Sequence, residues 1–99
     1  MPRYIALERW TDQGIRRFHE SGERAGESAK FMAQLDVTMV EVYWTMGAYD
    51  LVSIVDAPDD EAISAVLLAD AAKGNVRTTT FRAFSRAEME EIVRRASGL

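Results

Sequence analysis

The sequence predicts an α+β fold in which helices cover one antiparallel sheet of four strands. Two β-like runs, 37–46 and 51–57, flank the tetrapeptide Gly47-Ala48-Tyr49-Asp50. Glycine accepts the positive φ of a tight reversal, so this tetrapeptide predicts a hairpin. Segments of helical periodicity separate the hairpin from further β-like runs at 4–10 and 75–84.

The first half of the chain predicts a strand, a helix and a second strand. Branched and aromatic residues over 4–10 favour the strand, and Thr11 can cap the helix that follows. Ser21-Gly22 predicts a break in this helical region, which resumes near Glu23. The resumed helix has an apolar inner face of three residues: Phe31, Met32 and Leu35.

The second half predicts a helix, a fourth strand and a last helix. Pro58 cannot continue a central strand and suits the first turn of a helix. Gly74 is suited to the left-handed capping position at the end of that helix. After the Thr-rich strand, Ser85 and Glu88 have the spacing of a capping box.

The resulting order, β-α-β-β-α-β-α, begins with the ferredoxin-like split βαβ arrangement. Right-handed crossovers then favour the strand order 4-1-3-2, and the length predicts one domain over residues 1–99. The order alone leaves the role of the last helix open.

Alternation along the strands divides the sheet into two faces. We expect the helices to cover the more apolar face: Ile5, Leu7, Val40, Val42, Val52, Ile54, Phe81 and Ala83. The other face is then mixed: Tyr4, Ala6, Glu8, Glu41, Tyr43, Thr45, Ser53, Val55, Thr78, Thr80 and Arg82. No helix remains to cover it, which predicts a second copy of the chain there.

The hairpin admits two registers. A two-residue type II′ turn at Gly47-Ala48 pairs Tyr43 with Val52 and places both on one face. The polarity of the strands instead requires a three-residue loop, which separates the two. Both registers remain open from the sequence.

Composition excludes several functional classes. The net charge of −4 argues against nucleic acid and anionic membranes as partners, since both attract basic proteins. The absence of cysteine excludes disulfides, thiolate metal sites and cysteine nucleophiles. No signal peptide or membrane-spanning stretch is evident, so we expect a cytoplasmic protein without cofactors.

Five segments, in order along the chain, resemble the GYD domain family, whose Gly-Xaa-Tyr-Asp turn is Gly47-Ala48-Tyr49-Asp50 here. The other four are 11–15, 57–61, 74–80 and 82–84. The resemblance implies a dimeric α+β barrel, in which two ferredoxin-like sheets face each other. It implies no catalytic residue. The chain also resembles, more loosely, the effector-binding domain of Lrp/AsnC regulators. We do not expect a regulator role, because the sequence contains no DNA-binding pair of helices.

Glu8 and Arg82 are candidates for a binding site, because the predicted order makes their strands neighbours on the mixed face. A functional interpretation makes them the charged floor for a small polar ligand. A structural interpretation makes them an ion pair that sets the register of a dimer.

Five further residues are candidates on weaker grounds. Tyr4 and Tyr43 can line a ligand cavity, although aromatic residues on strands are more often core or interface. Tyr49 and Asp50 can lie at a cavity mouth, although Asp50 suits a bond to turn backbone. His19, the lone histidine, is the default titrating group, although its charged neighbours suit a surface position. We expect no metal site. The chain has only one histidine and no cysteine, and the acidic residues at a helix start are explained by the positive end of the helix dipole.

The sequence therefore favours a non-enzymatic homodimer that binds or senses a small polar or aromatic molecule. One alternative is a small cofactor-independent oxygenase or isomerase, with Tyr43, Glu8 or His19 as proton carriers. A purely structural or interaction dimer is a further alternative.

Overall fold

The computed structural model describes residues 1–99 and has the predicted order of strands and helices. The strands are β1 (Arg3–Trp10), β2 (Thr38–Trp44), β3 (Leu51–Asp56) and β4 (Val76–Ala83). The helices are α1 (Asp12–Arg16), α2 (Ser21–Met32), α3 (Asp60–Ala72) and α4 (Arg86–Ser97), with 3₁₀ turns η1 (Phe18–Glu20) and η2 (Ala33–Leu35). The strands form one antiparallel sheet in the order β2-β3-β1-β4, which confirms the predicted order and the ferredoxin-like arrangement.

Three local capping signals set helix boundaries as predicted, whereas Pro58 lies before α3 and not in its first turn, because Asp59 is the N-cap of that helix. The Thr11 side chain accepts a hydrogen bond from the Gly14 N–H (3.0 Å), and Gly74 has a left-handed φ of 85° after α3. Ser85 and Glu88 form a reciprocal capping box at the start of α4.

The predicted break at Ser21-Gly22 was wrong, because α2 begins at Ser21 and includes both residues. The chain leaves helical geometry earlier, at Arg17, where ψ is 42°. Glycine inside a helix costs about 1 kcal/mol, which packing of the rest of α2 offsets.

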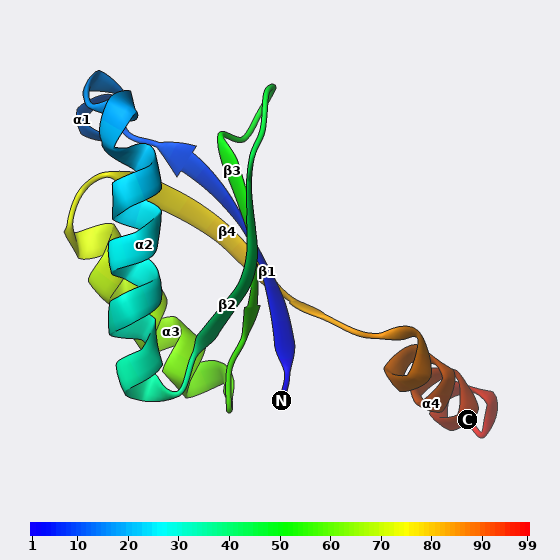
Figure 1. The fold of residues 1–99 in the computed structure, drawn as a ribbon. Coiled ribbons are helices and arrows are strands. Elements are labelled where there is room, and N and C mark those ends of the chain that lie inside the picture. Colours follow the sequence, from blue (N-terminus) through cyan, green and yellow to red (C-terminus); the bar gives the residue numbers. More distant parts are fainter.

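The hydrophobic core lies between the sheet and the helices α2 and α3 (Figure 1). Tyr4 of β1 and Val55 of β3 are paired across the sheet and belong to one buried cluster with Met32 of α2 and Val66 of α3. Because alternate residues of a strand share a face, these contacts identify the helix-covered face of the whole sheet.

The predicted assignment of faces was wrong, and the structure reverses it along β1, β3 and β4. The helices cover the face that bears Tyr4, Glu8 and Ser53, together with Thr80 and Arg82, which are paired with Ala6 and Tyr4. The expectation that the helices cover the more apolar face failed because polar residues line a cavity between the helices and the sheet, while apolar residues lie on the opposite face of the sheet.

The opposite face, named here the open face, has an apolar centre with polar residues around it. Paired residues in an antiparallel sheet point to the same side, which places on this face the apolar residues Ile5, Leu7, Tyr43, Val52, Ile54 and Phe81 and the polar residues Arg3, Arg9, Glu41, Asp56, Arg77 and Thr79. Phe81 is 45% exposed and Tyr43 is 54% exposed. No helix of the chain lies against this face (Figure 1).

The hairpin has the register of the two-residue turn, so that sequence alternative was correct. Tyr43 pairs with Val52, and the Thr45 N–H donates to the Asp50 carbonyl (2.8 Å). Gly47 has a φ of 102°, which few other residues accept. One extra residue, a β-bulge between Met39 and Glu41, interrupts the pairing of β2 with β3.

Helix α4 stands away from the rest of the chain, on the side of the sheet opposite α2 and α3 (Figure 1). Its apolar residues Met89 and Val93 are exposed. The radius of gyration is therefore 15.1 Å, against about 13 Å expected for a compact domain of this length. None of the helices is long and apolar enough to cross a membrane.

Candidate functional site

A cavity of about 520 Å³ lies between α2 and the helix-covered face of the sheet. This volume is within the range of small-molecule sites. The side chains that matter for its chemistry form a polar end and an apolar wall. They are Glu8, Arg24, Ser28, Met32, Met39, Val42, Leu51, Ser53, Asp70 and Lys73.

Glu8 is the central polar residue of the cavity. Its Oε2 atom accepts a hydrogen bond from the hydroxyl of Ser53 (2.8 Å), and Ser53 is only 3% exposed. Burial raises the pKa of the Glu8 carboxyl above its ordinary value; the Ser53 hydrogen bond lowers it, and the charge of Asp70 raises it further. The site thus holds a carboxyl group that lacks full solvation.

The apolar wall comes from the sheet and from α2. Met39 and Val42 of β2 pair with Val55 and Ser53, which places both on the helix-covered face despite the bulge between them. Met32 closes the wall from α2 and is buried. An apolar part of a ligand can therefore contact this wall while a polar part reaches Glu8.

Asp50 fixes the strand that bears Glu8. Its Oδ2 atom accepts a hydrogen bond from the Trp10 N–H (2.9 Å), and its own N–H donates to the Glu8 carbonyl (2.8 Å). The sequence favoured a bond from Asp50 to nearby turn backbone. The partner is instead the backbone of β1, so the turn positions the strand beside the cavity rather than lining the cavity itself.

Of the seven predicted site residues, only Glu8 lines the cavity. Tyr4 is in the core, and its hydroxyl group donates a hydrogen bond to the carboxylate of Asp60 in α3. This hydrogen bond raises the pKa of the Tyr4 phenol to about 12. Tyr43 lies on the open face. Tyr49 lies under the guanidinium of Arg9, and His19 is exposed at η1.

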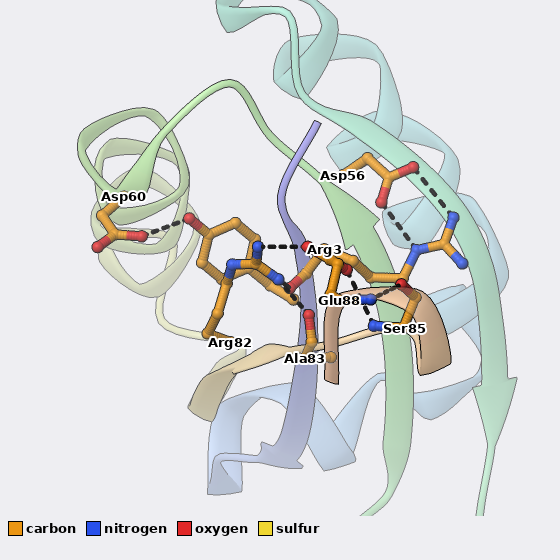
Figure 2. Close-up of polar contacts among 8 residues, drawn as sticks. Arg3, Asp56, Asp60, Arg82, Ala83, Ser85 and Glu88 are labelled. Carbon is orange, nitrogen blue, oxygen red and sulfur yellow. Dashed lines mark hydrogen bonds and ion pairs between the residues drawn. The ribbon is translucent and has the colours of Figure 1, made fainter. Parts of the chain in front are cut away.

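The predicted pairing of Glu8 with Arg82 was also wrong, although both residues are on one face. Arg82 lies opposite Tyr4, four residues along β1 from Glu8, and forms an ion pair with Glu88 at the start of α4 (3.0 Å). Figure 2 shows this pair beside a second one, between Arg3 and Asp56 (2.8 Å). Arg82 therefore joins the sheet to the start of α4 instead of forming a ligand floor.

Sequence reasoning missed the other polar residues of the cavity, among them Ser28, Ser53 and Asp70. Two of them had a signal. Ser53 occupies an inward position between Leu51 and Val55, and Asp70 lies one turn after Val66 on the apolar stripe of α3. A polar residue at a position that the pattern assigns to the core indicates a functional site. No group of three or more His, Asp or Glu side chains converges to hold a metal ion.

Replacement of Glu8 by glutamine should change how stability depends on pH. Because the folded pKa of Glu8 is raised, the native state binds more protons than the unfolded state between the unfolded pKa, near 4.5, and the folded pKa. The contribution of Glu8 is therefore complete below pH 4.5 and is lost as pH rises through the folded pKa. Urea unfolding should show Glu8→Gln more stable than the parent at pH 8, with a smaller difference at pH 4. An equal difference at both values would contradict the burial of this charge.

Comparisons with known proteins give the same fold. A relative in Thermus thermophilus, named glutamine synthetase and cystathionine beta-lyase binding protein, is 31% identical over 90 residues, which are 90% of this chain and 95% of that protein. The crystal structure of TTHA0845, also from Thermus thermophilus, has a TM-score of 0.54 and 29% identity, covering 86% of this chain and 95% of that one. Hypothetical protein PHS023 from Pyrococcus horikoshii, at 19% identity, shares the fold with a TM-score of 0.53 over 87% of this chain and 93% of that one.

The molecule is thus a ferredoxin-like α+β protein with a cavity that contains a carboxyl group between its sheet and its helices. The GYD domain matches residues 4–93. The chain belongs to the GYD domain family, as its turn and neighbouring segments predicted.

Proposed function

We propose that this protein is a non-enzymatic homodimer that binds a small molecule in the cavity of each protomer. The cavity of about 520 Å³, with Glu8 and Ser53 at its polar end, is the observation on which the proposal rests. A partly buried carboxyl group without a charged partner reduces stability, so the presence of Glu8 in a cavity favours a role in ligand binding.

The open face supports the homodimer. The accessible surface of the chain is 6634 Å², whereas a monomer of 11.1 kDa typically exposes roughly 5,700 Å². The excess of about 900 Å² is close to the area that one partner buries in a standard interface. A second copy, seated on the open face, would form the dimeric α+β barrel that family resemblance implies.

Helix α4 also favours a partner. Isolated helices of this length are marginal in water, and α4 exposes an apolar stripe that its own chain leaves uncovered. Its position on the open-face side places it beside any copy that sits there. We infer that α4 contributes contacts to the dimer.

A protein-binding role is the second candidate, because the Thermus thermophilus relative is named as a binding protein for two enzymes. In that case the dimer would present a surface to another protein, and the cavity would have no ligand or would regulate the contact. An enzymatic role is a further alternative, for which the raised pKa of Glu8 is the favouring observation.

Native mass spectrometry of the purified protein tests the proposal. We expect dimers that retain a small compound, released on unfolding and chemically unchanged by incubation with the protein. Ala25 lines the cavity, so Ala25→Phe should abolish retention; Ala65 is exposed on α3, so Ala65→Phe is the matched control.

Three outcomes separate the candidates. Chemical conversion of the compound would favour the enzyme. Failure to retain any compound, together with no stabilisation in a thermal-shift screen of small molecules, would contradict ligand binding. Capture of glutamine synthetase or cystathionine beta-lyase by the unliganded dimer would then favour the protein-binding role.

A further inference from the structure

We propose that the cavity binds an organic cation, such as a primary amine with a small apolar body, whose charged group contacts Glu8 and Asp70. This inference rests on the proposed function and specifies the class of its ligand. The pairing of charges around the cavity and the apolar character of its wall support it.

The basic groups at the cavity are already engaged. Arg17 forms an ion pair with Glu20 (2.6 Å). Arg24 donates to the carbonyls of Arg17 (3.0 Å) and Gly14 (3.1 Å), so it secures α1 and η1 to α2. The ammonium of Lys73 lies 4.0 Å from the centre of the Phe31 ring. None of the three forms an ion pair with Glu8 or Asp70.

The two carboxyl groups have only neutral partners. Glu8 accepts from the Ser53 hydroxyl (2.8 Å), and Asp70 accepts from the Ser28 hydroxyl (3.1 Å). A hydroxyl donor orients a carboxylate but does not neutralise its charge. The whole lining holds five carboxyl groups (Glu8, Glu20, Glu23, Glu27 and Asp70) against three basic groups (Arg17, Arg24 and Lys73), so carboxyl groups exceed basic groups by two and the potential of the site is negative, which a ligand of positive charge can match.

The apolar wall and the volume of the cavity favour an organic cation over a metal ion. Apolar side chains from β2, β3 and α2 form the wall: Met32, Met39, Val42 and Leu51. Ca²⁺ requires six or more oxygen ligands, and no group of three carboxylate or imidazole side chains converges here. A cavity of about 520 Å³ also exceeds the size of a single ion. An ammonium group on an apolar body therefore fits both the polar end and the apolar wall of the cavity.

Three probes of nearly equal size test the class of ligand: benzylamine, benzyl alcohol and benzoate. In isothermal titration calorimetry at pH 7.5 and 150 mM salt, we expect benzylamine to bind at least about tenfold more tightly than benzyl alcohol. Benzoate should bind most weakly, because its carboxylate would face two others.

Two variants and one control locate the charged group. Glu8→Gln and Asp70→Asn should each weaken benzylamine binding by about tenfold or more, while binding of benzyl alcohol changes less than threefold. The unchanged alcohol affinity also shows that each variant is folded. Glu61→Gln, at an exposed carboxylate outside the cavity, should leave the affinity for all three probes unchanged.

Failure of this inference differs from failure of the proposed function. Equal affinities for benzylamine and benzyl alcohol, or a Glu8→Gln variant that binds benzylamine as the parent does, would overturn the organic cation and leave the cavity as a binding site. If no probe binds and no compound is retained after purification, both proposals are wrong.

Discussion

Replacement of Leu7 by glutamate should convert the proposed dimer into a folded monomer. Leu7 lies on β1, in the middle of the open face, where it pairs with Val52 on one side and Thr79 on the other. A two-fold interface would contain the substitution twice and bury both charges without a partner. At roughly 2 kcal/mol for each site, the dissociation constant should rise about a thousandfold.

Light scattering coupled to size-exclusion chromatography measures this change, and circular dichroism reports whether the monomer is folded. Leu68→Glu is the matched control, because Leu68 is 73% exposed on α3, away from the open face. We expect this control to stay dimeric. A parent protein that is monomeric at micromolar concentration, or a Leu7→Glu variant that still dimerises, would refute the proposed interface.

Replacement of Gly14 by alanine should reduce the free energy of unfolding by about 3 kcal/mol. An added Cβ atom would lie 2.1 Å from the carbonyl oxygen of Asn75, far inside van der Waals contact. That oxygen also accepts the hydrogen bond from the Thr11 N–H (3.0 Å), so neither backbone segment can move without loss of the bond. Helix α1 would separate from the segment between α3 and β4, which should lower Tm by roughly 15 °C.

Gly26→Ala provides the opposite expectation from the same chemical change. Gly26 lies inside α2, and nothing is within 4 Å of an added Cβ atom. Alanine there should stabilise the protein by about 0.5–1 kcal/mol through higher helix propensity. Thermal unfolding of both variants measures the contrast, and similar Tm values for the two would disprove the close approach at Gly14.

The order of strands and helices could be predicted because most boundaries have a local cause, although the break between α1 and α2 was placed at the wrong residues. Thr11, Gly74 and the Ser85–Glu88 capping box act within a few residues of the chain, so a reader of the sequence can recognise them. The register of the hairpin was equally local, since turn chemistry at Gly47 favoured the correct pairing of Tyr43 with Val52.

The two faces of the sheet could not be predicted, because polarity alone does not say what covers an apolar surface. Ile5 and Leu7 are more apolar than Tyr4 and Glu8, yet the helices cover the second pair. An apolar face can be kept for another molecule, and a polar one can line a cavity. Both departures from the usual pattern occur where we place functions, the dimer and the ligand.

The candidate site was predicted only in part for the same reason. Glu8 was identified together with Arg82 because their strands are neighbours, but the role of its partner Ser53 depended on which face the helices cover. Arg82 was assigned to the same site by strand adjacency alone. Its long side chain reaches Glu88 instead, which the position of α4 determines.

The extra residue in β2 has a consequence for how related sequences are aligned with this one. Met39 and Val42 both reach the cavity wall only because the bulge shifts the alternation of the strand between them. Deletion of Val40 would restore regular pairing, with Met39 opposite Val55 and Glu41 opposite Ile54, and would leave Val42 and Tyr43 on their present sides. A homologue that is one residue shorter at this point should therefore keep its aromatic residue on the open face when the gap is placed at Val40, whereas a gap placed elsewhere in β2 would match interior side chains with exterior ones.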